Sequence, residues 1–99
     1  MQINLEALPP QADERLREFV TQKVERLGKF YARIVEADVF LKSGNDPENG
    51  AVAEIRLNVP QDTLFCEEHA PTFEEAIDKC SHAMERQVKR YKDKHASHA

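Results

Sequence analysis

The chain has 99 residues, 40% of them hydrophobic, which suits one domain with a single core and is too short for two domains. Its formal net charge of -4 argues against indiscriminate binding to nucleic acids, and no apolar run reaches membrane length. Two cysteines are too few for a disulfide framework, and the N-terminus lacks the pattern of a secretory signal. We therefore expect a cytoplasmic protein with reduced thiols and no membrane partner.

The first third of the chain predicts a strand followed by a helix. Apolar and polar residues alternate from Met1 to Leu8, which is typical of a half-buried strand. Pro9 and Pro10 end this strand, and Asp13 is suited to cap a helix. Apolar residues then recur at helical spacing and predict a helix over residues 13–31: Leu16, Phe19, Val20, Val24, Leu27 and Tyr31.

Three more strands are expected in the middle of the chain. Alternation returns over residues 35–41 with Val35 as the first inward side chain, and again over residues 51–59 beyond the turn-rich segment SGNDPENG. A short apolar run over residues 63–67 predicts the last strand. Two assignments of its buried side chains stay open: Leu64 with Cys66, or Phe65.

The C-terminal part predicts a long helix. Thr72 and Glu75 have the spacing of a capping box, in which the threonine hydroxyl accepts a hydrogen bond from the N3 amide. An apolar stripe then runs along the helix: Phe73, Ile77, Cys80, Met84, Val88 and Tyr91. We expect residues 1–95 to form a single domain and residues 96–99 to fray.

These elements predict an α+β fold of order β-α-β-β-β-α. The sheet should be mixed and four-stranded, with a parallel first pair and antiparallel pairs thereafter, because only a helical crossover joins parallel neighbours. Each helix has a single apolar stripe, so both should pack on one sheet face. The other face should meet water, and its outward side chains are those of Phe40, Val52, Glu54 and Arg56. Weak homo-oligomerisation through this face is an alternative role for it.

Positive charge gathers toward the end of the chain. Residues 79–99 carry six lysines and arginines against two acids, whereas the rest carries eight against sixteen. On the last helix the basic side chains lie opposite the apolar stripe: Lys79, His82, Arg86, Lys89 and Arg90. On the first helix the basic side chains extend from one flank of the apolar stripe to the side opposite that stripe: Arg15, Lys23, Arg26 and Lys29.

Together these helices predict one continuous positive surface suited to phosphates, with the acids kept on the first helix's far flank, the outer strand positions and the loops. A solvated face usually mixes signs at i and i+4, yet here only Glu85 and Lys89 form such a pair. The alternative is a protein-binding regulatory module that acts through its acidic surface. Salt discriminates the two, since phosphate binding weakens steeply with salt.

Metal and catalytic sites are not predicted. Cys80 and His82 are two positions apart on a helix and point in different directions, so they form no zinc pair with Cys66 and His69. The chain has neither a glycine-rich phosphate loop nor a zinc-protease or nucleophile-elbow motif. We expect no cofactor and no enzymatic activity.

Three segments together resemble a known family over essentially the whole chain: LREFVTQKVERLGKFYARI, ADVFLK, and AID followed by ERQVKRYKDK. The chain resembles the ribosome hibernation-promoting factor and ribosome-associated inhibitor A family. The resemblance is to its short members, because the long members add a C-terminal dimerisation domain and this chain stops at Ala99.

The resemblance implies binding to 16S-type rRNA on the interface side of the small ribosomal subunit, with no DNA partner. Such proteins occupy the channel for messenger and transfer RNA and inhibit translation in stress or stationary phase. The family's basic positions match at five residues: Lys23, Arg26, Lys29, Arg86 and Arg90. Lys89 is an additional basic residue beside them and not a matched position. Ala83 replaces a lysine common in the family, and Phe73 replaces a tyrosine. The resemblance leaves two types open, one that promotes ribosome dimers and one that prevents them, and the absence of a long acidic tail favours the promoting type only slightly.

Overall fold

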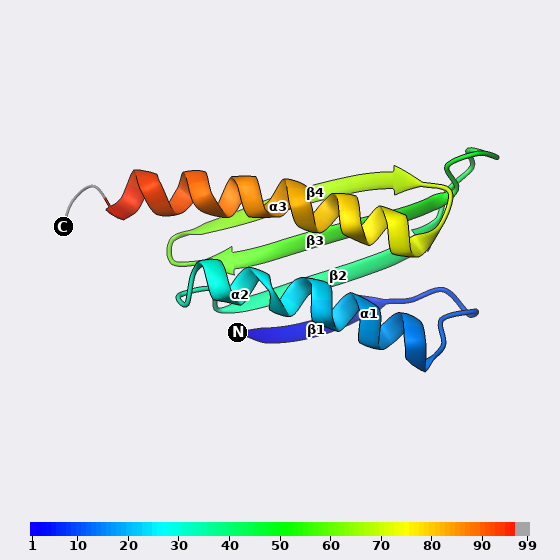
Figure 1. Cartoon of the computed structure of the whole chain (residues 1–99), viewed down its shortest axis with the longest axis horizontal. Helices are drawn as coiled ribbons and strands as arrows, with labels where there is room; N and C mark the ends of the chain where they lie inside the picture. Colours follow the sequence, from blue (N-terminus) through cyan, green and yellow to red (C-terminus); the bar gives the residue numbers. More distant parts are fainter. Residues whose placement is uncertain (97–99) are drawn as a thin grey trace.

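The computed structural model describes residues 1–96 and has the predicted α+β topology (Figure 1). Its elements are β1 (Gln2–Ala7), α1 (Glu14–Glu25), α2 (Leu27–Phe30), β2 (Glu36–Ser43), β3 (Ala51–Val59), β4 (Asp62–Ala70) and α3 (Phe73–Ala96). The four strands lie in the order β1-β2-β3-β4, with β1 parallel to β2 and the other pairs antiparallel. The predicted order and pairing are confirmed.

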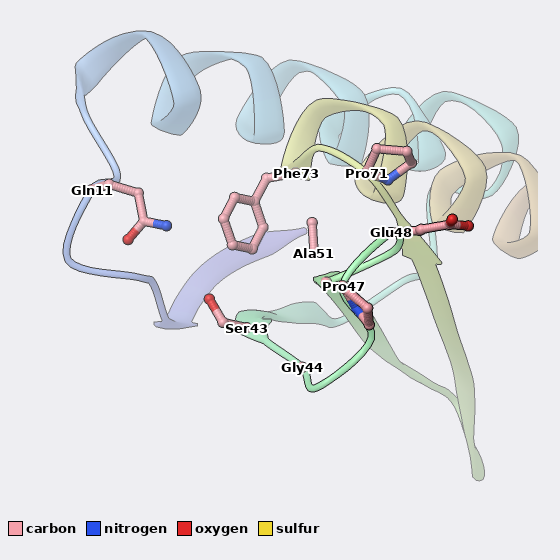
Figure 2. Close-up of a pocket in the computed structure, with 9 residues that line it drawn as sticks. Gln11, Ser43, Gly44, Pro47, Glu48, Ala51, Pro71 and Phe73 are labelled. Carbon is pink, nitrogen blue, oxygen red and sulfur yellow. The ribbon is translucent and has the colours of Figure 1, made fainter.

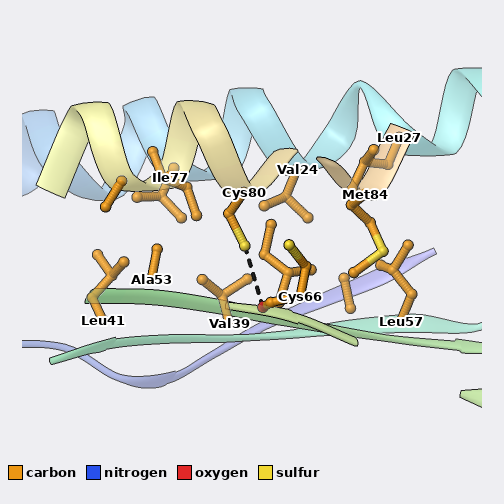
Figure 3. Close-up of a cluster of buried hydrophobic side chains, with 14 of the residues drawn as sticks. Val24, Leu27, Val39, Leu41, Ala53, Leu57, Cys66, Ile77, Cys80 and Met84 are labelled. Atoms are coloured by element: carbon orange, nitrogen blue, oxygen red, sulfur yellow. Dashed lines mark hydrogen bonds between the residues drawn. The ribbon is translucent and has the colours of Figure 1, made fainter. Parts of the chain in front are cut away.

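The core lies between the sheet and the helices α1 and α3, which run side by side over one sheet face (Figure 1). Side chains from the helices meet the inward side chains of the strands in one buried cluster (Figure 3). Val24, Ile77 and Met84 from the helices are fully buried, as are Val39 and Leu57 from the sheet. The single apolar stripe of each helix therefore sets which helix face remains outward.

Both predicted helix caps are present. The Asp13 carboxylate accepts a hydrogen bond from the Leu16 amide at 2.9 Å, and the Thr72 hydroxyl accepts one from the Glu75 amide at 3.2 Å. These bonds satisfy amides that have no partner within the first turn. Local sequence chemistry thus determines where α1 and α3 begin.

The single helix expected over residues 13–31 is wrong in one respect. It is divided at Arg26 into α1 and the short α2, and the Lys29 amide donates to the Arg26 carbonyl at 3.1 Å. This bond spans three residues, as in the tighter 3₁₀ helix. The apolar spacing continues through the break, so periodicity alone could not reveal it.

The sheet answers the open question about β4 and corrects two other expectations. Cys66 faces the core at 8% exposure, whereas Phe65 is 48% exposed on the outer face. Val35 lies before β2 and is 61% exposed, so the strand and its alternation begin one residue later than predicted. Val52 was expected to meet water but is 3% exposed, since its register neighbours and the hairpin loop at Gly44 surround it.

The two cysteines are free and buried. The Cys80 thiol donates to the Cys66 carbonyl at 3.3 Å, and burial raises the pKa of the Cys80 thiol above its ordinary value (Figure 3). Within residues 1–96 no three potential ligands gather in a way that would hold a metal ion. The tail expected over residues 96–99 lies outside the described residues except for Ala96, which ends α3.

None of the helices within residues 1–96 combines the length and the apolar character needed to cross a membrane.

Candidate nucleic-acid interface

Three side-chain contacts hold α3 along the edge of β4 and fix the rotation of the helix. Gln87 donates to the Phe65 carbonyl at 2.8 Å, Lys79 donates to the His69 carbonyl at 3.2 Å, and the Cys80 thiol bonds to β4 as described above. At its C-terminal half, the Tyr91 hydroxyl donates to the Pro60 carbonyl. Because these contacts and the buried stripe face the sheet, the remaining side of α3 faces outward.

The outward side of α3 carries Arg86, Lys89 and Arg90, which we call the cationic row. All three side chains are exposed, and together they line a shallow hollow of about 330 Å³. Among residues 1–96, no carboxylate lies within 4.0 Å of any of the three. The expected i,i+4 pair between Glu85 and Lys89 is therefore absent, and the row has no internal neutralising partner.

Lys89 also contacts the neighbouring helical segment. Its ammonium lies 5.2 Å from the centroid of the Phe30 ring on α2, a cation-π distance. The Lys92 ammonium donates to the Phe30 carbonyl at 3.2 Å. Lys29 on α2 is exposed, and its side chain forms no ion pair within the described chain. The end of α2 thus packs against the C-terminal half of α3 through Phe30, and the exposed Lys29 precedes that residue in the chain.

Lys23 and Arg26 are arranged differently from the sequence prediction. Lys23 pairs with Asp78 at 2.7 Å, and the Arg26 Nε lies 3.4 Å from Glu85. We call these four residues the interhelical seam. The acids were expected away from the positive surface, but two of them lie between the helices. One continuous, unpaired positive surface is therefore the wrong description.

The seam is a set of solvent-accessible ion pairs and not a buried network. The side chains of Lys23 and Asp78 are 30% and 39% exposed, whereas those of Arg26 and Glu85 are 58% and 15% exposed. The hydrogen bond and charge of Lys23 lower the pKa of the Asp78 carboxyl below its ordinary value. Asp78 is consequently ionised at neutral pH and holds the Lys23 ammonium.

A sequence signal for the seam existed. Asp78 and Glu85 are seven residues apart, so two helical turns bring them to the same side of α3. Lys23 and Arg26 are three apart and share a side of α1. The mutual approach of these two sides depends on how α1 is set against α3, which periodicity does not determine.

The outer sheet face also carries basic side chains, but each of them contacts a partner. Lys42 pairs with Glu54 at 2.5 Å, His69 lies 3.2 Å from Glu67, and the Arg56 guanidinium lies 5.3 Å from the Phe40 ring centroid. Two further acids accept hydrogen bonds from asparagines within the sheet: Glu36 and Asp38. This face is consequently a poorer candidate for phosphate binding.

A second hollow, of about 300 Å³, lies at the opposite end of the molecule, between the β2–β3 hairpin and the start of α3 (Figure 2). The Phe73 ring extends into it, with Gln11 on one side and Pro47 and Glu48 of the hairpin on the other. No lysine or arginine lines this hollow. It therefore lacks the charge needed to bind a polyanion.

Comparison with known proteins agrees with the fold and with the resemblance noted above. The model of the family described as Sigma 54 modulation protein / S30EA ribosomal protein matches residues 10–96. The ribosome hibernation promotion factor of Deinococcus radiodurans is 34% identical over 84 residues. That match covers 83% of this chain and 44% of the relative, so the chain spans less than half of the relative's length.

Solved structures show the same fold. A ribosomal subunit interface protein from Coxiella burnetii superposes with a TM-score of 0.80 at 17% identity, covering 94% of this chain and 99% of that one. The N-terminal domain of Thermus thermophilus Protein Y gives a TM-score of 0.74 at 26% identity, covering 89% and 98% respectively. The chain therefore belongs to the Sigma 54 modulation protein / S30EA ribosomal protein family.

Proposed function

We propose that this chain binds the interface side of the small ribosomal subunit and inhibits translation by occupying the channel for messenger and transfer RNA. The cationic row would contact phosphates of 16S-type rRNA, and Lys29 would add a contact from α2. Lys23 and Arg26 would join them at the seam. The mechanism is steric and involves no catalysis, cofactor or metal, and it places the protein in the cytoplasm.

One observation carries this proposal. Arg86, Lys89 and Arg90 are exposed side by side on a rigid helix, with no carboxylate within 4.0 Å among the described residues. Unpaired cations on one face are suited to a polyanionic backbone, because phosphate contacts supply most of the affinity for nucleic acids. The elongated body, 47 × 24 × 18 Å, is suited to insertion along a channel.

Sucrose-gradient sedimentation with separated ribosomal subunits tests the proposal. The protein should sediment with small subunits, and subunits already loaded with messenger RNA and transfer RNA should bind it less. The logarithm of the binding constant should fall by about 0.7 to 0.9 per neutralised phosphate for each tenfold rise in salt. Co-sedimentation with large subunits alone, or binding that does not respond to salt, would contradict the proposal.

A further inference from the structure

The two positive parts of the helical face differ in net charge. Among residues 1–96, the cationic row contributes three positive charges with no carboxylate within 4.0 Å, whereas the seam has two positive charges paired with two negative ones. A phosphate that approaches the seam therefore meets Asp78 and Glu85 together with Lys23 and Arg26. The acids repel the phosphate and already engage the groups that would bind it.

We infer that Asp78 and Glu85 set the affinity for RNA by holding Lys23 and Arg26 as internal substitutes for phosphate groups. The inference rests on the proposed function. A carboxylate presents to an ammonium or guanidinium the same kind of anionic oxygen as a phosphate does. RNA can engage the seam only by displacing these carboxylates, so the seam reduces affinity relative to the row.

The two pairs should differ in strength. The Lys23 ammonium touches Asp78 at 2.7 Å and is only 30% exposed at the side-chain level, so phosphate must replace an existing contact. Asp78 is also 3.9 Å from the His82 ring, so a second group lies near the same carboxylate. Arg26 meets Glu85 through Nε at the longer distance of 3.4 Å, and its side chain is 58% exposed. Because this pair is longer and its cation is more exposed, Glu85 should restrain RNA binding less than Asp78.

An opposite role for the acids is conceivable in physical terms. A carboxylate can also orient a lysine and so reduce the entropy lost on binding, in which case its removal would weaken binding. The sign of the change therefore decides between restraint and positioning. The close contact of Lys23 favours restraint, because its ammonium already touches the Asp78 carboxylate at 2.7 Å.

The test measures equilibrium binding of the fluorescently labelled 99-residue chain to purified small ribosomal subunits at several salt concentrations. Asp78→Asn should bind about threefold to tenfold more tightly than the unchanged protein at low salt. Glu85→Gln should bind about twofold more tightly. Glu18→Gln is the matched control, because it removes one exposed acid from the side of α1 where Glu14 and Glu25 lie. It should change affinity by less than about twofold.

Two further readouts separate displacement from a structural effect. The salt dependence of Asp78→Asn should steepen by about 0.7 to 0.9 in logarithmic slope, because Lys23 would then release counterions on binding phosphate. In a protein that already carries Lys23→Gln, adding Asp78→Asn should raise the affinity for small subunits by no more than the Glu18→Gln control does. Thermal midpoints of the variants should lie within about 4 °C of the unchanged protein, as expected for exposed pairs.

The outcomes distinguish the two proposals. Equal or weaker binding by Asp78→Asn, while the unchanged protein binds small subunits, would overturn the inference and leave the proposed function standing. A gain that persists without Lys23 would also overturn it. If the unchanged protein fails to bind small subunits, the proposed function falls and the inference falls with it.

Discussion

The outer sheet face and the cationic row both present basic side chains to solvent, but they differ in what lies beside those side chains. On the sheet, Lys42 touches Glu54 and Arg56 stacks near Phe40. On α3, Arg86 and Arg90 have no carboxylate within 4.0 Å in the described part of the chain. The two pairs of basic residues carry the same charge, but the pair on α3 should bind an anion better than the pair on the sheet.

The difference follows from the geometry of the two elements. Across an antiparallel pair, side chains directly opposite lie close together, so Lys42, Phe40 and Glu54 sit within one small neighbourhood. On an exposed helix side, only positions three or four apart meet; Glu85 and Asp93 occupy such positions around Lys89, yet within residues 1–96 neither carboxylate lies within 4.0 Å of the row. A charge count on the sequence therefore identifies a binding surface only after the partners of each charge are known.

The largest effect should come from reversing the row. Arg86→Glu with Arg90→Glu should weaken binding to small subunits at least a hundredfold, about 3 kcal/mol, because two attractive contacts become repulsive. The free energy of unfolding should change by no more than about 0.5 kcal/mol, since both side chains are exposed. Sedimentation and urea denaturation measure the two quantities on the same sample.

A matched pair of neutralised variants makes the comparison between faces direct. Arg86→Gln with Arg90→Gln should weaken binding at least tenfold and reduce the salt slope by about 1.4 to 1.8. Lys42→Gln with Arg56→Gln removes the same charge from the sheet and should change affinity less than about threefold. Similar losses from both pairs would show that net charge, and not the row, determines binding.

The next effect concerns the core that holds the two faces in place. Met84 is fully buried beneath the row, and Met84→Ala should lower the free energy of unfolding by about 2 to 5 kcal/mol through lost packing and a residual cavity. Lys89→Ala on the outer side of the same helix should change it by no more than about 0.5 kcal/mol. Urea denaturation monitored by circular dichroism measures both; a loss under 1 kcal/mol for Met84→Ala would contradict the buried assignment.

Much of the fold could be predicted because its signals are local. Asp13 and Thr72 start helices through their own side chains, and alternation identified three of the strands. The buried side of β4 stayed open because three apolar residues in succession fit either face. The register with β3 decides that Cys66 points inward, because it sets Cys66 opposite the fully buried Ile55 and Phe65 opposite the exposed Arg56.

The site was predictable to the extent that it lies on one helix. Angular positions on α3 placed Arg86, Lys89 and Arg90 outward without knowledge of any other element. The pairing of Lys23 with Asp78 depends on the contact between α1 and α3, which no single-helix pattern contains. The outward placement of these three side chains is therefore confirmed and the unpaired state of Lys23 and Arg26 is wrong, while the binding of RNA by any of them stays a prediction.

The smallest effect should come from the turn between β3 and β4, which leaves both charged faces untouched. Gln61 has a φ of 67°, in the left-handed region that favours glycine over other residues. Gln61→Gly relieves that cost but adds freedom to the unfolded chain, so the net gain should be about 0.5 to 1 kcal/mol.

For a domain of this size, such a gain raises the thermal midpoint by about 2 to 8 °C, which calorimetry measures. Gln61→Ala keeps the unfavourable φ and should not raise the midpoint. Binding to small subunits should stay unchanged, because the turn carries none of the proposed contacts and the Pro60 carbonyl still accepts the Tyr91 hydrogen bond. A stabilised protein with altered affinity would instead mean that the turn contributes to the interface, and the row would then be only part of it.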